Sequence, residues 1–127
     1  MPTALVMGAS RGIGLEFVRQ YRAAGARVLA TARDAAGLDR LEALGATALR
    51  LDVANPTSVS GLAWQLDGEK IDIALYVAGV IDRAGATTPP TRDTFDHVMH
   101  TNVLGAMQAL PQVAPLVEAA GGCFAFI

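Results

Sequence analysis

The sequence has almost no cysteine, no long apolar run and no block of like charge, and each absence narrows what the chain can be. Cys123 is the only cysteine in 127 residues, which excludes an internal disulfide and favours a reducing, cytoplasmic location. No apolar run approaches the ~18 residues that a membrane span requires. The N-terminus shows neither the basic segment nor the long apolar segment of a signal peptide.

Charge is sparse and mixed along the whole chain. Charged residues make up 17%, the net charge is -2, and no run of like charge exceeds two residues. This pattern favours neither nucleic acid nor an anionic membrane as a partner. A chain of this length buries roughly two thirds of its unfolded surface, and nothing in it reads as a linker or a repeat. We therefore expect one domain over residues 1–127.

Apolar segments alternate with helical patterns, and this alternation predicts an α/β fold with a parallel sheet covered on both faces. The expected strands cover residues 3–7, 27–32, 47–51 and 71–77. Gly25 and Gly45 are expected to end the first two helices, and Asn55-Pro56 to begin the third. A loop is expected over residues 82–90, and Pro111 and Pro115 should bend or interrupt the long helix that follows.

Each expected helix carries an apolar stripe at helical spacing. The stripes are Ile13, Phe17, Val18, Tyr21 and Ala24; Leu38, Leu41 and Leu44; Val59, Leu62, Ala63 and Leu66; and Phe95, Val98, Met99, Val103, Ala106, Met107 and Leu110. Trp64 and Met99 are interpreted as packing residues, and Cys123 as an inert apolar residue in a buried strand.

The first strand runs directly into a glycine-rich turn with the spacing G-x-x-x-G-x-G. Glycines let the backbone turn tightly and approach a diphosphate, and the N–H groups of the following helix face the anion. The candidate phosphate-binding residues are Gly8, Ser10, Arg11, Gly12, Ile13 and Gly14. The alternative interpretation is a tight strand-to-helix turn with no ligand.

Four further motifs follow in order: Asp52-Val53, Ala78-Gly79, Asn102 and a closing strand over residues 121–127. Together with the glycine turn they resemble the short-chain dehydrogenase/reductase family, especially its carbonyl-reductase-like members. The resemblance implies a Rossmann-type doubly wound sheet of strand order 3-2-1-4-5, with the dinucleotide at the carboxyl ends of the strands. It also implies an oxidoreductase acting on a carbonyl or alcohol substrate.

The end of the second strand indicates which cofactor is used. NAD-selective members of the family have an acid where this chain has Ala32, and Arg33 follows. Arg33, helped by Arg11, is therefore expected to bind the 2′-phosphate of NADP(H) with paired, charge-assisted hydrogen bonds. The alternative is two solvated arginines. Asp34 lies where the general fingerprint expects a ribose-binding acid, but we expect it to begin the next helix instead.

The resemblance assigns roles to the remaining motifs. Asp52 and Val53 would bind the adenine, and Ala78 and Gly79 would lie along the cofactor; the alternative for Asp52 is a helix-start acid. Tyr76 and Val77 replace the two asparagines that usually precede Ala-Gly, and their side chains cannot make the same amide bonds. Met7 stands where the family usually has Thr.

Asn102 matches the fourth member of the family's catalytic set, which bends its helix and holds a proton-relaying water; the alternative is a satisfied core amide. The family's catalytic Ser and Tyr-x-x-x-Lys do not occur in these 127 residues. We therefore expect a cofactor-binding part that does not catalyse hydride transfer by itself. We also expect a homo-oligomer, because the apolar run over residues 123–127 would form an edge strand that can pair with another chain. A non-catalytic nucleotide-binding module remains the alternative.

A metal site is not expected. His97 and His100 lie three residues apart near Asp93 and Asp96, a spacing that could hold a metal in principle. No further ligand set supports it, so we interpret these side chains as a solvated helix face.

Overall fold

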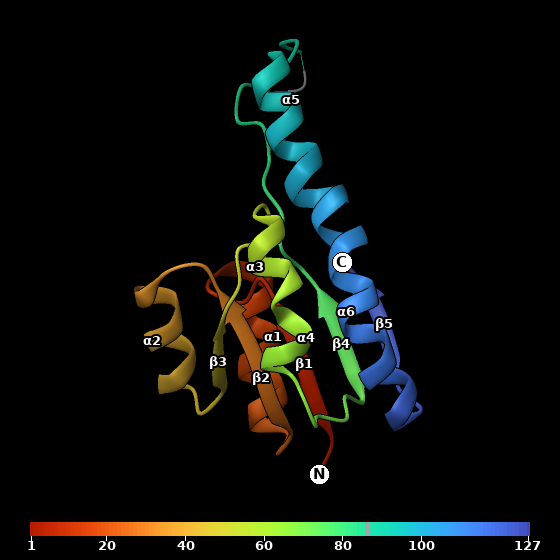
Figure 1. Ribbon diagram of the computed structural model, residues 1–127. Helices are drawn as coiled ribbons and strands as arrows, with labels where there is room; N and C mark the ends of the chain where they lie inside the picture. The colour runs from red at the N-terminus through yellow and green to blue at the C-terminus, as the bar shows by residue number, and fades with distance from the viewer. Residues whose placement is uncertain (86) are drawn as a thin grey trace.

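The computed structural model describes residues 1–85 and 87–127, so Ala86, in the loop predicted over residues 82–90, lies outside the described residues. Its centre is a five-stranded sheet of order β3-β2-β1-β4-β5 (Figure 1). All neighbouring strands are parallel, which confirms the predicted fold class and strand order. The strands are β1 (Thr3–Met7), β2 (Arg27–Ala32), β3 (Thr47–Arg50), β4 (Ile73–Tyr76) and β5 (Cys123–Phe126).

Three strands are shorter than predicted: β3, β4, which also ends one residue early at Tyr76, and β5, which was expected over residues 121–127. Residue 71 was expected to begin the fourth strand, but the Ile71 N–H donates to the carbonyl of Leu116, in the last helix, at 3.1 Å. The third strand ends one residue early, although the Leu51 N–H still donates to the Ala32 carbonyl at 3.1 Å. Both residues are fully buried, so burial extends beyond the ladder that defines each strand.

Helices cover both faces of the sheet. Helices α1 (Gly12–Ala23) and α2 (Ala35–Ala43) pack on one face against side chains such as Val6 and Ala30. Helices α3 (Pro56–Ser60), α4 (Leu62–Gln65) and α6 (Gly105–Ala120) pack on the other face against Leu5 and Met7. Successive strand residues therefore enter opposite cores, which is why these strands read as continuous apolar runs. As predicted, Asn55 caps α3 by accepting from the Thr57 N–H at 3.0 Å, with Pro56 in the first turn.

A long helical rod precedes β5, the last strand. It consists of α5 (Arg92–Met99), a π-helical segment η1 (His100–Leu104) and α6, and α5 projects beyond the sheet (Figure 1). The predicted interruption at Pro111 and Pro115 is wrong, because α6 runs through both. The two prolines are four residues apart and exposed, so the backbone bonds they remove lie on one solvent-facing side. Neither this rod nor any other helix in the described part of the chain is long and apolar enough to span a membrane.

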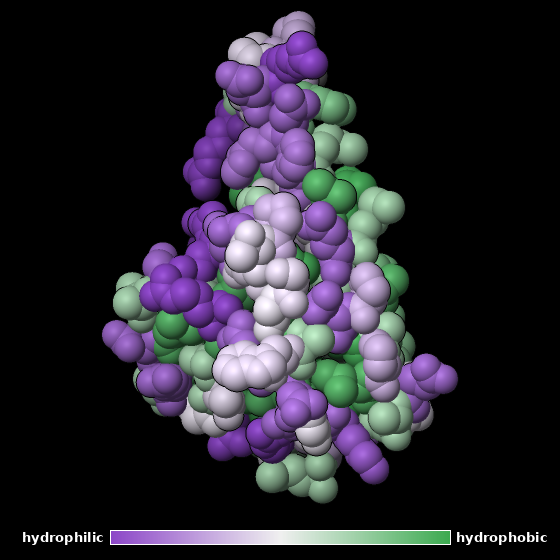
Figure 2. Space-filling model, in the orientation of Figure 1, coloured by the Kyte–Doolittle hydropathy of each residue, from purple (hydrophilic) through white to green (hydrophobic). Residues whose placement is uncertain are grey.

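Several residues predicted to pack are exposed. Trp64 is 83% exposed and Ile13 64%, while Ala24, Ala63 and Cys123 also face outward. The same holds along the rod, where the outward-facing residues are Phe95, Met99, Val103 and Met107. Figure 2 shows hydrophobic atoms gathered along one side of this rod. Helical periodicity was correct there, but no described element covers the stripe.

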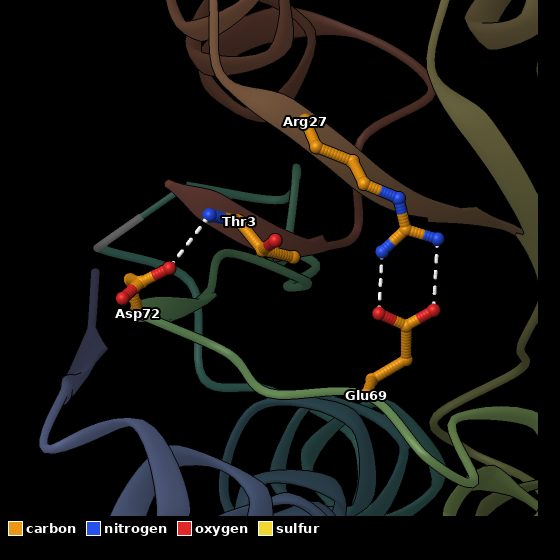
Figure 3. Close-up of polar contacts among 4 residues, drawn as sticks. All are labelled: Thr3, Arg27, Glu69 and Asp72. Atoms are coloured by element: carbon orange, nitrogen blue, oxygen red, sulfur yellow. Dashed lines mark hydrogen bonds and ion pairs between the residues drawn. The ribbon is translucent and has the colours of Figure 1, made fainter. Parts of the chain in front are cut away.

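The amino ends of the strands are tied together by polar contacts. Arg27, which begins β2, forms a bidentate ion pair with Glu69 (Figure 3). Beside it, the Thr3 N–H donates to the Asp72 carboxylate at 2.7 Å. The Arg27 and Glu69 side chains are 39% and 24% exposed, so this pair contributes at most about 1 kcal/mol. These contacts hold together the amino ends of the strands, at the end of the sheet opposite the candidate site.

Candidate functional site

A cleft of about 260 Å³ opens at the carboxyl ends of the central strands, where the strand order reverses. Ligands of doubly wound sheets bind at this position. Every residue predicted to bind a cofactor lines it: Gly8, Ser10, Arg11, Gly12, Ile13, Gly14, Arg33, Asp52, Val53, Ala78 and Gly79. Predicted residues from four separate stretches of sequence are thus brought to one cavity.

Two glycines of the turn are required by close backbone contacts. A Cβ on Gly8, which has a φ of +86°, would lie 2.5 Å from the backbone of Ala78. A Cβ on Gly14 would lie 2.1 Å from the Gly8 carbonyl oxygen. Because real Cβ atoms do not approach so closely, these glycines let β1, α1 and the end of β4 meet. Gly12 has a φ of +58°, and a Cβ there would meet nothing within 4 Å, so its backbone is open for an approaching ligand.

Thr31 supports the turn and was missed by sequence analysis. Its hydroxyl accepts from the Gly8 N–H at 3.0 Å, and its carbonyl accepts from the Ala9 N–H at 2.9 Å. A hydroxyl from the neighbouring strand, β2, thus bonds the first glycine of the turn. Thr31 is 1% exposed and lines the cleft. The available signal was a polar residue inside the otherwise apolar run of β2.

The segment after β2 presents a cation, Arg33, to the cleft. Arg33 is exposed and lines the cavity, and Ala32 precedes it. Asp34 caps α2 by accepting from the Gly37 N–H at 2.8 Å, as predicted. Among the described residues, the ion pairs within 4 Å are Arg19–Glu16 and Arg27–Glu69. Neither includes Arg33 or Arg11.

Asp52 and Val53 form the wall on the β3 side of the cleft. The Asp52 carboxylate accepts from the Ala54 N–H at 3.0 Å, and its own N–H donates to the Ser58 hydroxyl at 3.0 Å. Val53 is 6% exposed. These bonds hold the segment after β3 so that a carboxylate and an apolar side chain border the cavity together.

Asn102 fastens the π-helical segment to the segment after β4. Its amide N–H donates to the Val80 carbonyl and its amide oxygen accepts from the Val80 N–H, both at 2.8 Å. Gly79 lies beside this contact, since a Cβ there would be 3.3 Å from the Asn102 oxygen. Asn102 is exposed, so the alternative of a core amide is wrong. Its neighbour Thr101 lines the cleft.

Tyr76 makes a second link between β4 and the π-helical segment. Its hydroxyl donates to the Thr101 carbonyl at 2.8 Å, and the residue is 3% exposed. Burial raises the pKa of Tyr76 to about 12. Gly105 gives the phenol room, because a Cβ there would lie 2.7 Å from the Tyr76 oxygen.

The described residues contain no group of three or more His, Cys, Asp or Glu side chains that could hold a metal. Both histidines are exposed on the rod. His100 Nδ1 lies 2.6 Å from the Asp96 carbonyl, within its own helix.

The family model described as "short chain dehydrogenase" matches residues 2–127. An uncharacterised short-chain type dehydrogenase/reductase of Sinorhizobium fredii is 35% identical over 79% of this chain and 40% of its own length. Galactitol 2-dehydrogenase of Agrobacterium fabrum is 32% identical over 91% of this chain and 47% of its own length. The chain therefore spans less than half the length of these curated relatives.

Solved structures agree with this assignment. A short-chain dehydrogenase/reductase from Burkholderia multivorans with bound NADP superimposes with a TM-score of 0.88 at 30% identity, over 99% of this chain and 58% of that one. The RhlG/NADP complex of Pseudomonas aeruginosa gives 0.82 at 32% identity, over 94% and 49%. With the cleft geometry and the family match together, the chain belongs to the short-chain dehydrogenase family.

Proposed function

We propose that this chain is the cofactor-binding part of an NADP(H)-dependent oxidoreductase that acts on a carbonyl or alcohol substrate. The observation that carries the cofactor choice is Arg33, which follows Ala32, lines the cleft and takes part in no ion pair within the part of the chain that the structure describes. An acid at the end of β2 would accept from a ribose hydroxyl and repel a phosphate, whereas Arg33 attracts one. The bound NADP of two similar structures supports the same choice.

The residues of the cleft fit a dinucleotide. The open backbone of Gly12 and the first N–H groups of α1 suit the diphosphate, since both supply donors and the helix dipole favours an anion. Asp52 and Val53 suit the adenine, and Arg33 and Arg11 suit the 2′-phosphate. Ala78 and Gly79 lie along the path from the diphosphate to the reacting ring. When bound, the nicotinamide supplies the hydride.

Asn102 remains the proposed member of the catalytic set in this chain. Both ends of its amide bond to Val80, so we assign it the task of holding the backbone beside the cleft. A proton donor and a group that polarises the substrate oxygen complete such chemistry in the family. These 127 residues contain no Tyr-x-x-x-Lys. The oxidoreductase activity is therefore proposed for the whole protein and not for this chain alone.

The proposal extends to self-association and to a cytoplasmic location. The outward apolar stripe of Phe95, Met99, Val103 and Met107 is the surface we assign to contact between copies. The apolar edge strand β5 adds a second surface that favours pairing. A single cysteine, exposed at Cys123, suits a reducing compartment.

Calorimetric titration with NADPH and NADH tests the cofactor choice. We expect tighter binding of NADPH, because each charge-assisted contact to the 2′-phosphate contributes roughly 1.5–3 kcal/mol. Arg33→Ala should then weaken NADPH binding by about one to two orders of magnitude and leave NADH nearly unchanged. Arg92→Met, which removes a cation from the start of α5, is the control. Equal affinities, or an Arg33→Ala variant that keeps its preference for NADPH, would refute the assignment.

A further inference from the structure

Two arginines that do not line the cleft donate hydrogen bonds to the backbone of the two candidate phosphate-binding segments. Arg40, on α2, donates from Nη1 to the Ser10 carbonyl, which directly precedes Arg11. Arg50, at the end of β3, donates from Nη1 to the carbonyl of Arg33 itself at 3.0 Å. Each arginine that lines the cleft therefore has a second arginine that donates a hydrogen bond to its own carbonyl (Arg33) or to the carbonyl of the residue before it (Arg11).

The surrounding packing explains why these arginines reach the turn. Gly37 brings α2 against it, because a Cβ there would lie 2.9 Å from the Ser10 Cβ and 2.8 Å from the Ala32 Cβ. Arg40 follows one turn later on the same helix. Arg50 is the register partner of Ala32 in the β2–β3 ladder, so it lies one position from Arg33 on the neighbouring strand. In both arrangements the donor belongs to a helix or strand, and the acceptor carbonyl belongs to the short segment that follows a strand.

Positive charge also gathers around the candidate phosphate-binding segments, where Arg11, Arg33, Arg40 and Arg50 lie. Four guanidinium groups lie around the carboxyl ends of β2 and β3, and none of the four takes part in the ion pairs of the described residues. Three acids are close in sequence: Asp34 caps α2, Asp39 precedes Arg40, and Asp52 lines the cleft. None of the three takes part in the ion pairs of the described residues. Carbonyl acceptors thus take the place of carboxylates for Arg40 and Arg50, which leaves the positive charge available to an anion.

We propose that Arg40 and Arg50 are positioning residues for the 2′-phosphate, Arg40 acting through Arg11 and Arg50 through Arg33. This inference rests on the proposed NADP(H) function. Fixing the Ser10 and Arg33 carbonyls holds the backbone from which the two phosphate-binding side chains extend. Less ordering is then needed when the nucleotide binds, and selectivity for a 2′-phosphate rises.

The experiment compares adenine nucleotides with and without the 2′-phosphate, using the chain as it is. Dissociation constants for 2′,5′-ADP and 5′-ADP are measured by calorimetry for the wild type, Arg40→Met and Arg50→Met. Methionine keeps an apolar stem but removes the donor and the charge. We expect about a 3–10-fold loss for 2′,5′-ADP, as for one hydrogen bond, and less than about a twofold change for 5′-ADP. Arg92→Met serves as the control.

A double-mutant cycle separates positioning from a direct charge effect. If Arg50 acts through Arg33, adding Arg50→Met to Arg33→Ala should change the 2′,5′-ADP affinity by less than about twofold. The same holds for Arg40→Met added to Arg11→Ala. Additive losses, or single variants that keep the wild-type selectivity, would overturn the positioning role while the cofactor assignment stands. A wild type that binds both nucleotides equally would overturn the cofactor assignment and this inference together.

Discussion

Replacing the buried hydroxyl of Tyr76 should destabilise the junction between β4 and the π-helical segment. Tyr76→Phe keeps the ring, which packs beside Phe126 with centroids 6.2 Å apart, and removes only the bond to the Thr101 carbonyl. A buried hydrogen bond contributes about 0.5–1.5 kcal/mol, and an acceptor left without its partner costs about 1–3 kcal/mol. We therefore expect the free energy of unfolding to fall by about 1–2 kcal/mol, or by several degrees in Tm.

The pH dependence gives this prediction a second signature. The unfolded-state pKa of tyrosine is about 10, and in the folded chain burial raises the pKa of Tyr76 to about 12. The folded state therefore keeps this proton at a pH where the unfolded state has lost it. By linkage, the stability of the wild type falls as the pH rises from about 10 to about 12. The phenylalanine variant lacks this contribution, so the gap between the two proteins should narrow over that range.

Urea unfolding at pH 7.5 and at a series of pH values above 9 measures both effects. Tyr21→Phe is the matched control, because the Tyr21 side chain is partly exposed and its hydroxyl makes no hydrogen bond within the described residues. It should change stability by less than about 0.5 kcal/mol. If Tyr76→Phe is as stable as the wild type, or if the gap does not change with pH, the argument from the Tyr76–Thr101 bond is wrong.

Three further predictions concern binding, assembly and chemistry. Gly12→Ala places a methyl group at a positive φ over the open backbone of the turn, so NADPH affinity measured by calorimetry should fall at least tenfold. Gly68→Ala, which is also at a positive φ in open space, is the control and should leave this affinity unchanged. Sedimentation should show concentration-dependent association that Val103→Glu weakens, since a charge would enter the exposed stripe; a stable monomer at high concentration would contradict this. The 127-residue chain with NADPH and a panel of aldehydes, ketones and quinones should show no loss of nicotinamide absorbance, and robust turnover would require a proton donor not identified in this sequence.

The fold was predictable because its main signals are local. Apolar runs bounded by glycines marked the strands, and the Asn55-Pro56 pair marked the start of α3. The errors concern which side of a helix is covered. Ile13 and Met99 have helical periodicity, yet Ile13 borders the cleft and Met99 lies on the part of the rod that extends past the sheet. Periodicity gives the direction of a stripe but not whether another element covers it.

The site was predictable where it depends on backbone and less so where it depends on long-range contacts. Gly8 and Gly14 are required by steric approach, so their spacing alone indicated the turn. The contacts of Thr31 to Gly8 and of Tyr76 to Thr101 join residues more than 20 positions apart. No local pattern marks such pairs, because each is set by the register of the sheet and the packing of the rod on it.

The most direct test of the central claim is a crystal structure of this chain with NADP⁺. We expect the diphosphate over the amides of Gly12–Gly14 and the 2′-phosphate within about 2.7–2.9 Å of the Arg33 guanidinium. We also expect the bonds from Arg40 to Ser10 and from Arg50 to Arg33 to persist in the complex. A dinucleotide bound away from the glycine turn, or a 2′-phosphate directed away from Arg33 and Arg11, would contradict the account.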